Sequence, residues 1–254
     1  MRMGLLAVVP FALAAAGCFE GQRTFKVNAD GSGTIVDTVK LGEEAKEMRD
    51  GLAGMDDSPA ADKAAKRKTK LAERAAAMGE GVSFVGVETT KDGGERFTYA
   101  FRDITLVRAS AMPSPDESTT SKDEPLTFRL AKSGGNTVLT VVHPPATPAE
   151  ASKEAAPAKS LEETAGEVAM MKKMLGGLKL RSVVEVNGKV VKTSSAWAVG
   201  PAVTLMEIDF DQIDPAGMAR MAASKERPSP AEMKGVKGVK VSDGEVSIEF
   251  AGGK

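Results

Sequence analysis

The residues of this chain that could do chemistry on their own are few. The chain has one cysteine, Cys18, and one histidine, His143. With one of each, the chain cannot supply the ligands of a Cys/His zinc site. His143 ends an apolar stretch and lacks a companion nucleophile at a recognisable spacing, so we interpret it as a structural residue rather than a general base. Neither a Gly-Lys-Ser/Thr phosphate loop nor a GxSxG motif occurs.

Three carboxylates alternate near the C-terminal third of the chain, at Glu207, Asp209 and Asp211. Paired carboxylates can perform acid–base chemistry or bind a cation. A spacing of two places them on one face of a strand, which is the pattern of a half-buried sheet, so we interpret them as a solvated strand face. The DGSG of residues 30–33 lacks the further acidic ligands of a calcium loop and is interpreted as a turn. We expect no catalytic residue, no metal site and no cofactor.

Cys18 stands at the end of a secretory signal pattern. Arg2 gives the N-terminus a positive charge, residues 4–16 are continuously apolar, and residues 15–17 (Ala-Ala-Gly) are small. The apolar stretch is about a dozen residues long, which is too short to cross a hydrocarbon core of roughly 30 Å. An exported cysteine without a second cysteine has no disulfide partner in its own chain.

The junction resembles the lipobox of bacterial lipoproteins, although Ala15 stands where leucine is usual. The resemblance implies removal of the signal peptide 1–17 and a diacylglycerol-cysteine with palmitate-type chains at Cys18. Stable anchoring to a membrane takes more than one acyl chain. The alternative is an ordinary cleaved signal followed by an incidental cysteine. Phe19 follows Cys18 where aspartate would signal inner-membrane retention in enteric bacteria, so the outer membrane is favoured.

The composition argues against several classes of function. The formal net charge is −1, so no overall field attracts nucleic acid, and we expect no such partner. Aromatic residues make up 4% of the chain, which supplies few stacking platforms for bases. Nothing after Cys18 is long and apolar enough to form a transmembrane helix.

Polar, proline-containing segments suggest how the chain is divided. Residues 111–125 and 144–160 are interpreted as flexible insertions. We predict three parts: a lipoprotein signal peptide over 1–17, an α+β exported domain over 18–224, and a linker with a small C-terminal hairpin over 225–254.

Strand and turn patterns predict a sheet built from hairpins. Alternating or β-branched strands stand on both sides of glycine-containing turns, and Asn187-Gly188 is the strongest of these turn signals. Successive hairpins favour a mainly antiparallel sheet. The predicted turns are 28–33, 91–94, 132–136, 187–188 and 242–244.

Helical patterns complete the expected fold. Apolar residues recur at spacings of three and four over 161–176, where Ser160 and Glu163 form a capping box. The basic run over 63–70 lies in a predicted helix, and we interpret it as a solvated face rather than a patch for anionic headgroups. The predicted fold class is α+β, a mainly antiparallel sheet with two to four packed helices. The predicted helices are 43–54, 60–78, 161–176 and 214–223.

Several motifs together resemble a set of bacterial lipoproteins that includes the mycobacterial LppM-like domain. A basic-apolar strand and a DGSG turn (23–33) follow the lipid-site cysteine, and a second hairpin ends in Phe-Arg-Asp-Ile (101–104). Asn-Gly-Lys-Val-Val (187–191) precedes a strand that ends in Asp-Phe (203–210). The resemblance implies a β-rich exported domain with packed helices, for which lipid binding has been proposed. It assigns a role to no individual residue.

One expected function and two alternatives follow. We expect a membrane-anchored, non-catalytic lipoprotein of the cell envelope that binds a lipid or another apolar ligand. The first alternative is a structural or protein-interaction lipoprotein of the envelope without a small-molecule ligand, its protein partner unknown. The second is a hydrolase with an unrecognised site. Whether the sheet encloses an apolar cavity or packs solid distinguishes the expected function from the first alternative.

Overall fold

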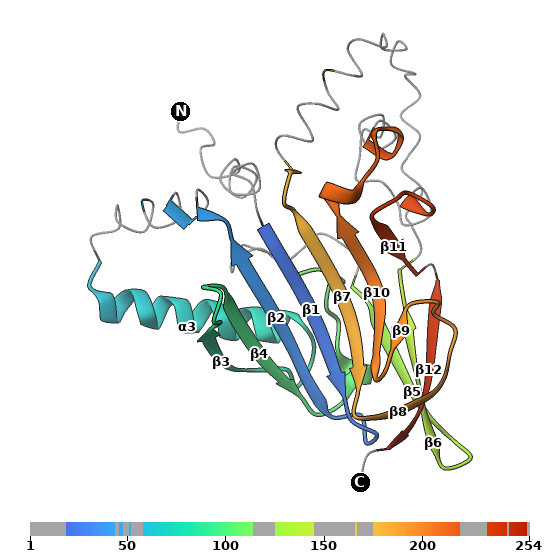
Figure 1. Cartoon of the computed structure of the whole chain (residues 1–254). Helices are drawn as coiled ribbons and strands as arrows, with labels where there is room; N and C mark the ends of the chain where they lie inside the picture. Colours follow the sequence, from blue (N-terminus) through green and yellow to red (C-terminus); the bar gives the residue numbers. More distant parts are fainter. Residues whose placement is uncertain are drawn as a thin grey trace, which may run out of the picture.

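The residues that the structure describes form two β-sheets and one long helix (Figure 1). The computed structural model describes residues 19–43, 46–47, 51, 58–113, 125–144, 166, 175–218, 233–242 and 244–252. The signal segment and Cys18 lie outside these residues, as do most of the two predicted insertions and most of the predicted helices 43–54 and 161–176.

The larger sheet has the strand order β11-β10-β7-β1-β2-β4-β3, with β9 paired to β10. β1 and β7 run parallel, and every other strand pair among the described residues is antiparallel. The strands are β1 (Phe19–Val27), β2 (Gly33–Leu41), β3 (Ser83–Thr89), β4 (Glu95–Phe101), β7 (Lys179–Val186), β9 (Ala198–Val199), β10 (Ala202–Asp209) and β11 (Val239–Val241).

The smaller sheet has the strand order β5-β6-β12-β8. Its strands are β5 (Thr127–Ser133), β6 (Asn136–Val142), β8 (Gly188–Thr193) and β12 (Glu245–Gly252). In the described part of the chain, the longest helical element is α3 (Ala60–Ala77), and two short 3-10 turns are η1 (Ile104–Leu106) and η2 (Phe210–Gln212).

The core lies between one face of the larger sheet and a layer made by α3 and the smaller sheet (Figure 1). Phe25 of β1 packs on Phe128 of β5, with ring centroids 5.1 Å apart. Leu71 of α3 belongs to the same continuous hydrophobic cluster. Burying one such large side chain contributes about 1.5–3 kcal/mol. The described side chains between the two sheets thus form one packed hydrophobic core. A smaller cluster around Phe210, Met218 and Met233 packs beside β10 and β11.

Two of the five predicted hairpins are wrong, because the chain changes sheet at those turns. Asn187 still belongs to the larger sheet, where its N–H donates to the carbonyl oxygen of Val27 at 2.8 Å. The next residue, Gly188, already pairs with Gly252 of β12 in the smaller sheet. Strands that pass from one sheet to the other form the corners of packed sheets.

The second corner lies between β11 and β12. Ser242 donates its N–H to the carbonyl oxygen of Leu205 in the larger sheet, whereas Gly244 accepts from the N–H of His143 beside the smaller sheet. The predicted C-terminal hairpin is therefore wrong as well. β12 instead lies in the interior of the smaller sheet, between β6 and β8. The hairpins predicted at 28–33, 91–94 and 132–136 are confirmed.

The predicted α+β class with two to four packed helices is also wrong. The described residues form mostly strands, and α3 is the one helix of seven or more residues among them. Its inward face offers Leu71 and Ala75 as buried residues, because most apolar residues of this helix are alanines. This small apolar face of α3 covers only part of the larger sheet. The smaller sheet, with its bulkier side chains, covers the rest. Of the helix predicted from 214, the described part is helical over 215–218.

The turn between β1 and β2 depends on two glycines for different reasons. Gly31 has a φ of 90°, in the left-handed region that glycine adopts at little cost. At Gly33 the constraint is space, since an added Cβ would lie 1.9 Å from the carbonyl oxygen of Lys26 and 2.7 Å from the ring of Phe101. The DGSG motif is therefore a requirement of this turn's geometry.

Replacing Gly33 with alanine is expected to lower the free energy of unfolding by about 1–3 kcal/mol or more, because the backbone cannot yield to the new methyl group without breaking the β1–β2 ladder. Gly86→Ala is the matched control, since Gly86 also lies in a strand and has no atom within 4 Å of an added Cβ. It is expected to be neutral or slightly stabilising. Urea unfolding followed by circular dichroism measures both, and equal losses would contradict this account.

Candidate functional site

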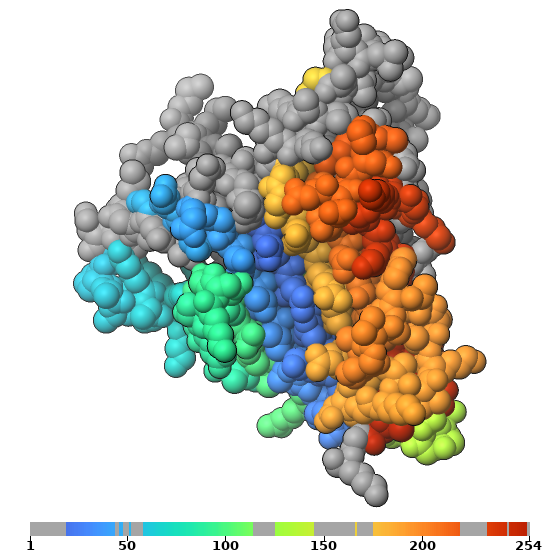
Figure 2. Space-filling view, viewed as in Figure 1, coloured from blue at the N-terminus to red at the C-terminus, as the bar shows by residue number. Residues whose placement is uncertain are grey.

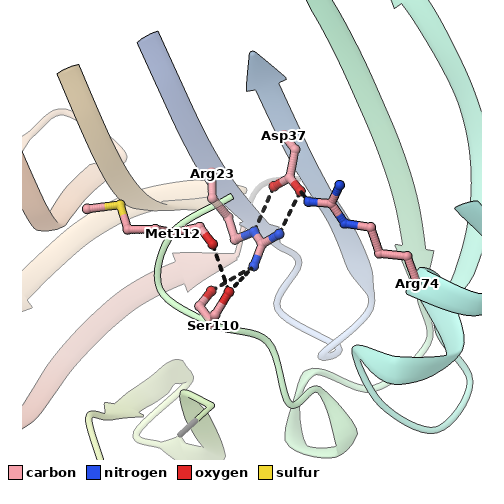
Figure 3. A network of polar contacts seen from close by, with 5 residues as sticks. All are labelled: Arg23, Asp37, Arg74, Ser110 and Met112. Atoms are coloured by element: carbon pink, nitrogen blue, oxygen red, sulfur yellow. Dashed lines mark hydrogen bonds and ion pairs between the residues drawn. The ribbon is translucent and has the colours of Figure 1, made fainter. Parts of the chain in front are cut away.

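A network of buried charges lies under α3, on the inner face of the larger sheet (Figure 3). The guanidinium of Arg23 on β1 donates to both carboxylate oxygens of Asp37 on β2, at 2.7 and 2.6 Å. Arg74 of α3 donates to the same carboxylate at 2.9 Å. Arg23 also donates to the carbonyl oxygen and hydroxyl of Ser110, at 2.8 and 3.0 Å. Ser110 in turn donates to the carbonyl oxygen of Met112 at 2.7 Å.

The network is almost completely shielded from water. The side chains of Arg23 and Asp37 are 2% and 0% exposed, and that of Arg74 is 9% exposed. Burying an ion costs several kcal/mol, which a two-point guanidinium–carboxylate contact and further hydrogen bonds offset. Arg74 additionally lies over the ring of Tyr99, 5.9 Å from its centroid. The arrangement joins β1, β2, α3 and the segment after η1, and these contacts make it a structural network within the protein.

Arg23, Asp37 and Arg74 were not among the candidate residues predicted from the sequence, although a signal was present. Strand alternation places Arg23 on the same face as Phe25, and Asp37 on the same face as Ile35. The hairpin turn at 28–32 then pairs position 23 with position 37. Opposite charges at paired, inward positions indicate a buried ion pair.

Replacing Asp37 with asparagine is expected to destabilise the fold by roughly 3–5 kcal/mol, because two buried arginines would lose their counter-charge. Asp209→Asn is the control: Asp209 pairs with Lys179 at 3.8 Å on the exposed face, and its loss is expected to cost less than about 1 kcal/mol. Chemical denaturation of both variants measures the difference. A loss below about 1 kcal/mol for Asp37→Asn would show that the network does not stabilise the fold.

A groove of about 440 Å³ lies at the end of the larger sheet where β1 and β7 finish and β2 begins. Lys26 and Glu185 form one charged wall, with 3.7 Å between the ammonium and a carboxylate oxygen. Asn187 forms another part and donates to the side-chain oxygen of Asn28 at 3.0 Å. The full lining is Lys26, Val27, Asn28, Gly33, Thr34, Glu185, Val186, Asn187, Gly188 and Pro201. This lining offers charges, amides and backbone, which suits a polar ligand or a protein surface.

The turn beside the groove is held by many short polar contacts. The carbonyl oxygen of Ala29 accepts from the ammonium of Lys132 at 2.6 Å, and that of Gly31 accepts from the N–H of Ile104 at 2.8 Å. The hydroxyl and N–H of Ser32 both donate to Asp30 and hold the pKa of its carboxyl below its ordinary value. These contacts bring the DGSG, Phe-Arg-Asp-Ile and Asn-Gly motifs together at one end of the molecule.

The face of the larger sheet that points away from α3 carries ion pairs, and Figure 2 views this face. Glu207 lies between Arg181 at 3.3 Å and Lys240 at 2.6 Å. Asp209 faces Lys179, whereas Asp211 lies in η2 and accepts the N–H of Gly177 at 2.9 Å. The predicted alternation of three carboxylates on one strand therefore holds for Glu207 and Asp209 and fails for Asp211, because the strand ends at residue 209. The first two are engaged in ion pairs.

The remaining sequence candidates are not brought together. His143 is half-buried after β6, and its backbone N–H donates to the carbonyl oxygen of Gly244. Cys18 lies outside the described residues, immediately before β1. Within the described ranges, no group of three or more His, Cys, Asp or Glu side chains is placed to hold a metal ion. In the same part of the chain, no helix has the length and apolar character needed to cross a membrane.

Comparison with known proteins finds one solved structure to which the chain is similar. No protein-family model matches the chain, and no curated protein matches it. The chain is similar to the folded domain of the Mycobacterium tuberculosis LppM protein, solved by NMR, with 12% sequence identity and a TM-score of 0.33. The similarity covers 100% of this chain and 97% of that chain.

Proposed function

We propose that this chain is a non-catalytic lipoprotein of the cell envelope, anchored through Cys18, that uses the groove near Lys26 and Asn187 to hold another envelope protein. The observation that carries the anchoring is the position of Cys18. It is the one cysteine of the chain, it ends a signal-like segment, and the next residue, Phe19, is the first residue of β1. Cleavage before Cys18 would thus remove no residue that the described fold uses.

The filled interior supports protein interaction in preference to lipid binding. An acyl chain needs an apolar space that water does not compete for. Between the two described sheets that volume holds packed side chains such as Phe25, Phe128 and Ile248. The groove lies at the surface instead, and Lys26, Glu185 and the asparagines beside them recognise polar groups. Polar, hydrogen-bonding surfaces of this kind are typical of the rims of protein interfaces.

Replacing Cys18 with serine is expected to abolish incorporation of labelled palmitate and to move the protein from the membrane fraction to the soluble fraction of the envelope, because no acyl chain can be attached. Ala15→Leu is the control, since it restores the residue usual at that position and is expected to leave both readouts intact. Membrane retention and labelling in the Cys18→Ser variant would overturn the anchoring. Separating the two membranes of the same cells tests the proposed location in the outer membrane.

A photo-crosslinking side chain introduced at Lys26 is expected to capture one dominant protein in living cells. Arg96 is the matched control position, because its side chain is 49% exposed on the same face, against 51% for Lys26, and lies away from the groove. The same adduct at both positions, or none at Lys26, would contradict a specific role for the groove. Lipid recovered from the purified protein by mass spectrometry, beyond its covalent anchor, would favour lipid binding instead.

A further inference from the structure

The chain leaves no spacer between the proposed lipid anchor and the folded domain. Phe19 directly follows Cys18, so their Cα atoms are about 3.8 Å apart. Phe19 is already paired with Leu41 in the β1–β2 ladder and is 7% exposed. Releasing it to act as a tether would expose its ring, at a cost of roughly 1.5–3 kcal/mol. The first strand therefore begins where the anchor ends.

One end of the larger sheet is fixed beside Cys18 by this connection. The strand ends that lie there follow from the register, because Glu20 pairs with Lys40 on one side and with Lys179 on the other. Lys179 in turn pairs with Asp209, the last residue of β10. We define the anchor end of the domain by Phe19, Glu20, Lys40, Lys179 and Asp209.

The groove lies at the opposite end of the same strands. β1 runs from Phe19 to Val27, eight residue steps, which corresponds to about 26 Å at a rise of 3.3 Å per residue. Its last residues, Lys26 and Val27, line the groove. Lys26 pairs with Glu185 in the ladder in which Glu20 pairs with Lys179, so the groove and the anchor end are separated by most of the length of the strand.

From this geometry we propose that the domain lies directly on the lipid headgroups with its anchor end, and holds the groove roughly 26 Å above the bilayer. The proposal rests on acylation of Cys18. The partner of the anchor end is the headgroup layer itself, without a preference for anionic lipid. Positive and negative side chains alternate there, since Glu20 stands between Lys40 and Lys179, and Lys179 faces Asp209. The missing spacer sets the orientation, and surface charge does not.

The test uses the mature, lipidated chain in vesicles of phosphatidylcholine that contain a small fraction of nickel-chelating lipid. Acylation blocks the sulfur of Cys18, so a single new cysteine can carry a spin label. Lys179→Cys and Lys26→Cys form a matched pair: both lysines are on the outer face, are 50% and 51% exposed, and have ion-pair distances of 3.8 and 3.7 Å. Strong relaxation by nickel is expected at position 179 and weak relaxation at position 26, at least a several-fold difference. Equal relaxation, or stronger relaxation at position 26, would overturn the orientation.

A second variant tests the cause. Sixteen Gly/Ser residues inserted between Cys18 and Phe19 have a root-mean-square reach of about 20–24 Å and are expected to make the two positions nearly equal. A difference that persists with this insertion would show that surface attraction, not the missing spacer, orients the domain. The intact mass of each preparation reports the acyl chains. Full acylation with equal relaxation rejects the orientation alone, whereas an unacylated chain rejects the anchoring proposal and the orientation with it.

Discussion

The ion pair between Arg23 and Asp37 is the interaction on which the register of the fold depends. Hydrophobic alternation decides which face of β1 and β2 turns inward, but a slip of two residues would keep the same face inward. Such a slip would place Arg23 opposite an apolar neighbour such as Ile35 or Val39. An unpaired buried charge costs several kcal/mol, which is comparable to much of the stability of a domain. The ion pair thus excludes registers that the apolar residues alone would tolerate.

The same carboxylate also determines where the next layer lies. Asp37 accepts from Arg74, so α3 must bring its C-terminal half over β2 and β4. Arg23 uses its remaining donors on Ser110, which fixes the segment that leads away from η1. An alanine-rich helix that buries few large side chains has little apolar area to hold it in one position. Here, directional hydrogen bonds to a buried acid supply the specificity that this helix's packing does not.

Local turn chemistry predicted where the chain bends but not which strand it meets next. The turns at 28–33, 91–94 and 132–136 join strands that pair with each other. At 187–188 the same kind of signal marks a corner, because β7 already has β1 and β10 as neighbours and offers no free edge to β8. Which strand pairs with which depends on the whole sheet, so it cannot be predicted from a short segment of sequence. The parallel pairing of β1 with β7 joins residues more than 150 positions apart in the sequence, and it too depends on the whole sheet.

The predicted fold class was wrong for a related reason. The helix predicted over 60–78 matches α3 within one residue, but composition alone could not say that a second sheet, rather than further helices, covers the first. The buried charges could have been found, since alternation and the turn position together place Arg23 opposite Asp37. The groove could not, because Lys26, Glu185 and Pro201 come from three separate parts of the chain and meet through the β1–β7 pairing and the β9–β10 turn.

The motifs that resemble those of bacterial lipoproteins meet at the groove end for structural reasons that are visible in their contacts. Gly31 and Gly33 shape the turn, Asp103 caps η1 by accepting from Thr105, and Asn187 extends the β1–β7 ladder before the chain changes sheet. Backbone geometry therefore explains these four motif residues. A turn held by this many contacts loses little conformational entropy when a partner binds beside it, and preorganised surfaces of that kind gain affinity for this reason. The many contacts of this turn and the absence of a spacer at the anchor end both agree with the proposed function, which is to hold a partner at a set distance from the membrane.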